Sequence, residues 1–120
     1  MNAHDHHTPR IFRPEPGDPG RPKRGLDEEA LRSQPTVFRD DLLADHTILI
    51  TGAGSGMGKA AAVLAARLGA NVAICGRTMD KLEGTTALIR EATGREILAQ
   101  PVNIRDADAV EGLIAAVHDR

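Results

Sequence analysis

The glycine-rich segment Thr51–Gly58 (TGAGSGMG) constrains the fold of this chain more than any other stretch. It follows the unbroken apolar run Ile48–Ile50, which is typical of a strand buried on both faces. After the glycines, alanine and other apolar residues recur at helical spacing. A strand, a glycine turn and a helix in this order predict an anion site, because the first N–H groups of a helix lack intrahelical partners and carry the positive end of its dipole.

Each glycine of the predicted site has its own structural reason. Gly52 lets the chain turn sharply out of the strand, Gly56 lets the backbone approach phosphate oxygens, and Gly58 lets the helix pack close to the strand. Ser55 and Met57 lie between them and complete the predicted cofactor-binding turn. The alternative is an ordinary strand-to-helix turn without a ligand.

Three similar strand–helix units follow one another along the chain. Strands are predicted at Thr47–Thr51, Asn71–Cys75 and about Glu96–Pro101, and helices at about Ser55–Leu68, Met79–Ala92 and Asp106–His118. Gly69 and Gly94 are placed as the residues that end the first two helices, and Asp106 as the N-cap of the third. Alternating units with short links predict a parallel sheet and an α/β fold, the N-terminal half of a doubly wound Rossmann-type sheet that stops before a fourth strand.

The segment before these units is interpreted as a disordered tail, residues 1–36, rich in proline and arginine. Asp27–Arg32 could form one helical turn, but that is too short to stand alone. The histidines of the tail, at positions 4, 6 and 7, are interpreted as solvated, since a mobile segment lacks the geometry of a metal site, and no metal is predicted. Residues 37–120 form the predicted partial nucleotide-binding domain, in which Val37, Phe38, Leu42 and Leu43 are expected to pack beside the first strand.

Composition limits the partners of the chain. Its 120 residues suit one domain or part of one, and a net charge of −2 favours neither nucleic acid nor a membrane surface as a partner. No apolar run approaches the ~20 residues of a membrane span. The single cysteine, Cys75, excludes a disulfide within the chain and fits the reducing cytoplasm.

A second cofactor signal follows the second strand. Rossmann sites that prefer NAD place a carboxylate there for the ribose 2′-hydroxyl, about 20 residues past the glycines. This chain has Arg77 and Thr78 instead. A guanidinium matches the oxygens of a 2′-phosphate, so we predict NADP(H) as the cofactor, with a solvated surface arginine as the alternative. Lys81, a little further along, is interpreted as a solvated helix residue.

The spacing of the glycine segment resembles the TGxxxGxG signature of the short-chain dehydrogenase/reductase family. It differs from the GxGxxG of other dehydrogenases and from the P-loop pattern. The resemblance covers residues 37–120 and implies binding of NAD or NADP on a doubly wound sheet. It also implies an adenine contact by Asn103 and Ile104, which stand where family members have aspartate followed by an apolar residue.

Three further segments resemble NADPH-dependent 2,4-dienoyl-CoA reductases and peroxisomal trans-2-enoyl-CoA reductases: FRDDLL at 38–43, RTMDKL at 77–82 and PVNIRDADAV at 101–110. This implies a reductase of fatty acid metabolism with an acyl-CoA substrate, in a family whose full-length members are usually homo-oligomers. Another reductase of the family, acting on a 3-oxoacyl thioester, a sugar or an alcohol, is the alternative.

The resemblance also implies an Asn-Asn-Ala-Gly segment after the fourth strand and, in most members, a catalytic Tyr-x-x-x-Lys pair, although the dienoyl-CoA reductases vary at the tyrosine. This sequence contains no tyrosine, and so no catalytic residue is assigned. We therefore expect the NADP-binding part of a reductase without its catalytic segment, and whether the chain is itself an enzyme stays open. A nucleotide-binding or interaction module without catalysis is the competing hypothesis.

Overall fold

The computed structural model describes residues 26–119. Its centre is a sheet of three parallel strands, β1 (Thr47–Thr51), β2 (Asn71–Gly76) and β3 (Leu98–Pro101), with β2 between the other two. Ile50 of β1 is paired with Ile74 of β2, and Ile74 with Ala99 of β3. Residues 72–75 of β2 are buried, whereas the flanking strands are only partly buried. A central strand covered on both faces explains why residues 71–75 read as a nearly continuous apolar run.

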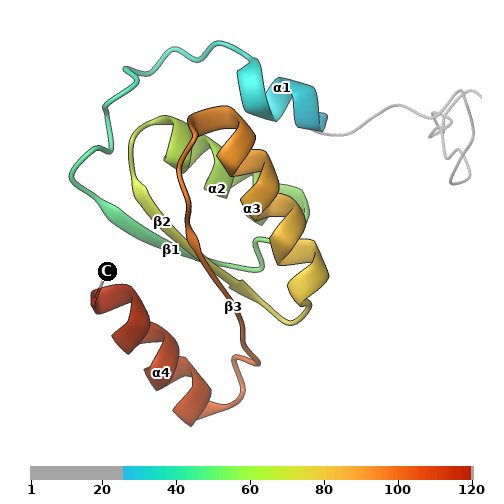
Figure 1. Ribbon diagram of the computed structural model, residues 1–120, viewed down its shortest axis with the longest axis vertical. Coiled ribbons are helices and arrows are strands. Elements are labelled where there is room, and N and C mark those ends of the chain that lie inside the picture. The colour runs from blue at the N-terminus through green and yellow to red at the C-terminus, as the bar shows by residue number, and fades with distance from the viewer. Residues whose placement is uncertain (1–25, 120) are drawn as a thin grey trace, which may run out of the picture.

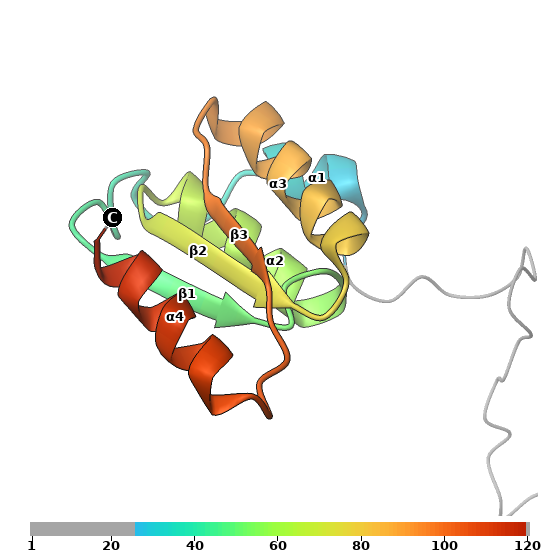
Figure 2. The same cartoon turned by 60° about the horizontal axis from the view of Figure 1, so that its bottom comes forward.

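Helices cover the two faces of this sheet. The helices α2 (Gly56–Arg67) and α3 (Met79–Thr93) lie side by side on one face, and α4 (Ala107–His118) lies on the other (Figures 1 and 2). Ile48, Ile50 and Ile74 pack in the apolar cluster beneath α2 and α3, whereas Leu49 and Cys75 pack in a second cluster with α4. Successive side chains of a strand point to opposite faces, so this alternation divides each strand between the two cores. The arrangement confirms the predicted α/β fold.

The helix ends follow local chemistry. The side chain of Asp106 accepts a hydrogen bond from the N–H of Ala109 and caps α4, as the sequence predicts. Gly69 and Gly94 have φ values of 95° and 72°, the left-handed backbone that ends a helix at low steric cost. Most element boundaries lie within one residue of the prediction, but β3 begins at Leu98 rather than at about Glu96. The Glu96 carboxylate instead accepts hydrogen bonds from the Arg90 guanidinium of α3, one of 2.8 Å, ahead of the first paired strand residue.

The predicted disordered tail is corrected at residues 28–33, which form a helix, whereas residues 1–25, with the three histidines, lie outside the described residues. A short helix, α1 (Glu28–Ser33), packs against α2 and α3. The side chain of Asp27 caps it by accepting from the N–H of Ala30 at 2.8 Å. A six-residue helix is marginal in isolation, and here tertiary contacts supply the missing stability.

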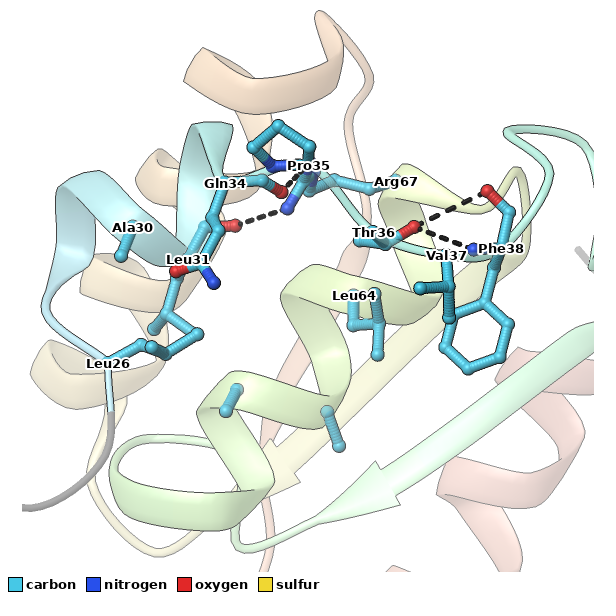
Figure 3. A pocket seen from close by; sticks show the side chains of 12 residues that line it. Leu26, Ala30, Leu31, Gln34, Pro35, Thr36, Val37, Phe38, Leu64 and Arg67 are labelled. Atoms are coloured by element: carbon cyan, nitrogen blue, oxygen red, sulfur yellow. Dashed lines mark hydrogen bonds between the residues drawn. The ribbon is translucent and has the colours of Figure 1, made fainter.

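Of the four lead-in residues predicted to pack beside the first strand, only Leu43 contacts the core. Val37 and Phe38 are 95% and 48% exposed, and Leu42 is exposed as well. The Leu43 N–H donates to the Leu68 carbonyl at 2.8 Å, which ties this turn to the end of α2 rather than alongside β1. Val37 and Phe38 line a hollow of about 390 Å³ between α1 and α2 instead, shown with its lining residues in Figure 3.

Candidate functional site

The glycine turn between β1 and α2 has a backbone conformation that requires glycine at several positions. Gly52 and Gly56 have φ values of 67° and 58°, which residues with a side chain rarely adopt. A Cβ atom on Gly58 would lie 2.3 Å from the carbonyl oxygen of Gly52, so only glycine lets α2 start this close to the strand. A Cβ on Gly56 would meet nothing within 4 Å, so the space beside it is open. Contact of these glycines with a cofactor stays a prediction.

The first backbone N–H groups of α2 receive no side-chain hydrogen bond from the N-cap residue and could donate to an acceptor outside the helix. Its N-cap, Ser55, is extended and makes no side-chain capping bond. No acidic residue lies in the first turn, and Met57 in that turn is 89% exposed. The first N–H groups of a helix point outward at its positive end, and an anion placed there satisfies them.

Helix α3 packs against the glycine turn and forms a hydrogen bond with it. Ala53 is fully buried, and its carbonyl oxygen accepts a hydrogen bond of 2.7 Å from the hydroxyl of Thr85, which is also fully buried. A Cβ on Gly54 would lie 2.7 Å from the Cβ of Lys81, so Gly54 allows α3 to approach. Neither Gly54 nor Thr85 was among the predicted site residues. The available signal for Thr85 was a polar residue in register with the buried stripe that includes Leu82.

A hollow of about 150 Å³ lies between the turn and the start of α3. Its lining residues are Gly52, Gly54, Ser55, Gly76, Arg77, Thr78, Lys81 and Leu82. The hollow thus brings together four of the predicted site residues, Gly52, Ser55, Arg77 and Thr78. Lys81, which was expected to be a solvated helix residue, lines it as well. No carboxylate lines this hollow, and within residues 26–119 neither Arg77 nor Lys81 forms an ion pair with one. The hollow therefore presents two cations that an anionic group could neutralise.

The other predicted residues lie outside this hollow. Asn103 and Ile104 follow β3 at the same carboxyl edge of the sheet, where the N–H of Val102 donates to Gly76 of β2 at 2.8 Å. The Asn103 side chain accepts a hydrogen bond from the N–H of Arg105 at 3.0 Å, and Ile104 is 69% exposed. Their predicted adenine contact stays a prediction.

Two other kinds of chemistry find no support in the described part of the chain. Burial raises the pKa of the Cys75 thiol, so the thiol stays protonated and is a poor nucleophile. No group of three or more metal-ligating side chains occurs among residues 26–119. None of the helices described is long and apolar enough to cross a bilayer.

Comparison with known proteins agrees with this geometry. A family model described as short chain dehydrogenase matches residues 46–120. Over 58 residues the chain is 48% identical to a probable 2,4-dienoyl-CoA reductase 3 of Caenorhabditis elegans, a match that covers 48% of this chain and 19% of that protein. Over 71 residues it is 39% identical to the 7beta-hydroxysteroid dehydrogenase of Clostridium sardiniense, covering 59% of this chain and 27% of that one.

A solved structure has the same fold. The short chain dehydrogenase of Shigella flexneri 2a complexed with NADP superposes with a TM-score of 0.64 at 33% identity, covering 68% of this chain and 35% of that one. The matches span between about a fifth and a third of the length of these proteins. Residues 46–120, which the family model matches, contain the glycine turn, the hollow lined by Arg77 and Lys81 (here called the cationic hollow) and all three strands of the sheet. The chain belongs to the short-chain dehydrogenase family.

Proposed function

We propose that this chain is the NADP(H)-binding part of a short-chain oxidoreductase. The observation that carries the proposal is the hollow beside the glycine turn, which is lined by Arg77 and Lys81 and by no carboxylate. An acidic residue there would bind the 2′-hydroxyl of NAD and repel the extra phosphate of NADP. The cations of Arg77 and Lys81 should instead attract this phosphate and favour NADP over NAD. The NADP complex of the Shigella flexneri relative also supports the proposal.

The residues present fit the cofactor in three places. The open side of Gly56 and the uncapped first turn of α2 suit the pyrophosphate. Arg77 offers a planar fork of donors for the 2′-phosphate, and Lys81 adds a mobile point charge. Asn103 and Ile104, at the same edge of the sheet, are proposed to contact the adenine. When bound, NADPH supplies a hydride, and the residues of this chain bind and orient it.

For the whole protein we propose reduction of an enoyl- or dienoyl-CoA in fatty acid metabolism, in the cytoplasm and as a homo-oligomer. The RTMDKL and PVNIRDADAV segments and the identity with the 2,4-dienoyl-CoA reductase of Caenorhabditis elegans support this substrate class. The buried, unpaired Cys75 thiol supports a reducing compartment. No residue of this chain is assigned to the chemical step.

A second candidate, a nucleotide-binding module without catalysis, rests on the complete lack of tyrosine in the sequence. The two candidates share the cofactor site and differ only in turnover. A third, a reductase of another substrate class, has support from the 39% identity with the 7beta-hydroxysteroid dehydrogenase.

The direct test is a titration of the 120-residue chain with NADPH and, separately, with NADH, followed by the nicotinamide fluorescence. One added charge-assisted contact is worth about 1.5–3 kcal/mol, so NADPH should bind at least about tenfold more tightly than NADH. Adenosine 2′-monophosphate should compete with NADPH, whereas adenosine 5′-monophosphate should compete less well. Equal affinity for the two dinucleotides, or no binding of either, would overturn the proposal.

A further inference from the structure

Residues 26–34, which comprise α1 and the residues on either side of it, are here called the N-terminal strap. The strap lies along α2 on the side away from the sheet (Figure 1). Leu31, at the middle of the strap, packs against the core cluster that contains α2 and α3. Arg32 forms an ion pair with Glu91 of α3, with 3.5 Å between the nitrogen and the oxygen. The strap is therefore held on two helices of the nucleotide-binding unit.

One end of the strap is fastened to the first turn of α2. The Glu28 carboxylate accepts a hydrogen bond of 2.7 Å from the ammonium group of Lys59, the residue that follows Gly58. The Lys59 side chain is only 18% exposed, so its stem is largely covered while its charge is matched by Glu28. The hydrogen bond and the charge of Lys59 lower the pKa of Glu28.

The other end is fastened to the last turn of α2. The Arg67 guanidinium donates to the carbonyl oxygen of Leu31 at 3.1 Å and to that of Gln34 at 2.6 Å, as Figure 3 shows. These are terminal carbonyls of a helix, which have no intrahelical donors, so Arg67 acts as a C-terminal cap supplied by another element. The strap thus runs beside α2 in the same direction and is bonded to it at both ends.

The strap also borders the glycine turn. A hollow of about 630 Å³ lies between them, lined on one side by Leu26, Asp27 and Glu28 and on the other by Gly54–Met57. The turn thus has the cationic hollow on one flank and the strap on the other. The backbone of Gly52 and Gly56 is intrinsically free, so holding the start of α2 reduces the conformational entropy that a ligand must remove on binding.

We propose that the N-terminal strap positions the glycine turn for the cofactor pyrophosphate, with Glu28 and Lys59 as its positioning residues. The proposal rests on the proposed function, since it concerns the same cofactor site. It assigns a binding role to a segment that precedes the family-matched residues 46–120.

A competing electrostatic effect has to be separated from positioning. Lys59 is a cation near an anion site, so removing Glu28 leaves a positive charge unmatched and would raise phosphate affinity if charge alone mattered. Salt weakens a charge effect and leaves positioning unchanged, so the titrations are run at physiological ionic strength, where we expect positioning to dominate. The two effects predict different signs for Glu28→Gln, and positioning alone predicts an effect of the uncharged change Leu31→Ser.

The experiment measures the dissociation constants of NADPH and of adenosine 2′-monophosphate for the 120-residue chain and for Glu28→Gln, Lys59→Met and Leu31→Ser. Glu28→Gln and Lys59→Met should each weaken NADPH about threefold, and Leu31→Ser about tenfold, as expected for changes in a coupled network. Adenosine 2′-monophosphate carries the 2′-phosphate but no pyrophosphate, so its affinity should stay unchanged in all three. A strap that only stabilised the fold would not separate the two ligands.

Glu29→Gln is the matched control. It removes the same charge from the neighbouring residue of α1, whose carboxylate pairs with Arg32 rather than with α2, and it should bind NADPH like the parent chain. Normal NADPH affinity in both Glu28→Gln and Leu31→Ser would overturn the strap while leaving the proposed function intact. Tighter binding by Glu28→Gln together with an unchanged Leu31→Ser would also overturn it, in favour of charge alone. A parent chain that binds no NADPH overturns the proposed function, and the strap proposal with it.

Discussion

The hydroxyl of Thr85, on α3, donates a hydrogen bond of 2.7 Å to the carbonyl oxygen of Ala53 in the glycine turn. Both residues are fully buried. The bond joins the element that follows the second strand to the turn that follows the first, and so it links the two walls of the cationic hollow. Leaving a buried carbonyl without a donor destabilises the folded state, so removing the Thr85 hydroxyl tests how much this bond stabilises the turn.

Replacing Thr85 by valine keeps the shape of the side chain and removes the donor. We expect the free energy of unfolding to fall by about 1–3 kcal/mol, because the carbonyl of Ala53 loses its partner away from water. Thr85→Ser should recover most of the loss. Thr86→Val is the control, since the Thr86 hydroxyl bonds only to Leu82 within its own helix. Urea unfolding followed by circular dichroism measures all three, and equal losses for Thr85→Val and Thr86→Val would contradict the prediction.

Gly58→Ala should destabilise the fold, whereas the same change at Gly84 should not. The new methyl group at Gly58 would lie 2.3 Å from the Gly52 carbonyl oxygen, and forcing α2 away costs about 1–3 kcal/mol. Gly84, inside α3, has nothing within 4 Å of its Cβ position, so alanine there should stabilise by roughly 0.5–1 kcal/mol through helix propensity. Thermal unfolding of the two variants gives the comparison. Melting temperatures that shift in the same direction would argue against a close approach at Gly58.

The cofactor preference should depend on Arg77 and, more weakly, on Lys81. Arg77→Asp should weaken NADPH by about tenfold or more while sparing NADH, because a charge-assisted contact to the 2′-phosphate becomes a repulsion. Lys81→Met should weaken NADPH about threefold, as expected for a mobile, exposed ammonium group. Arg105→Asp, which changes an exposed arginine outside the hollow, is the control. The measurement is a pair of titrations of each variant, one with NADPH and one with NADH. An unchanged ratio of the two affinities in Arg77→Asp would show that Arg77 is only a surface charge.

The Glu28–Lys59 pair should make the strap sensitive to acid. The pKa of Glu28 is lowered from its ordinary value of 4.5, first by the hydrogen bond from Lys59 and then by its charge. A lowered carboxyl pKa means that the stabilising contribution is present above 4.5 and is lost as the pH falls through the lower folded-state pKa. The difference in unfolding free energy between the parent and Glu28→Gln should therefore shrink towards zero below that range. A difference that stays constant from neutral to acid pH would show that the pair does not form in solution.

The chain by itself should not oxidise NADPH in the presence of an enoyl- or dienoyl-CoA. The sequence has no tyrosine to serve as the proton donor that the family resemblance implies, and Cys75 is buried and protonated. The absorbance of NADPH at saturating acyl-CoA is the measurement. Turnover above the rate without protein would show that another residue of this chain is catalytic.

The pattern of apolar residues and glycines was sufficient to predict the three strand–helix units and the glycine turn. Helix ends at Asp106, Gly69 and Gly94 were also readable, because capping depends on residues that are adjacent in sequence. The conformational demands on Gly52 and Gly58 follow from the same local rule. The start of β3 was predicted about two residues too early, because periodicity does not report where pairing with β2 begins, which is at Leu98.

The α/β class, the order of the elements and the place of the glycine turn thus follow from the sequence pattern, because each depends on short-range periodicity and backbone sterics. The remaining features depend on contacts between segments that are distant in the chain. Helix α1 exists because Arg67 and Lys59 of α2 bond to it, and Lys81 enters the hollow because Gly54 lets α3 approach. These contacts join residues about 30 or more positions apart, and their energy becomes available only when the sheet has brought those segments together.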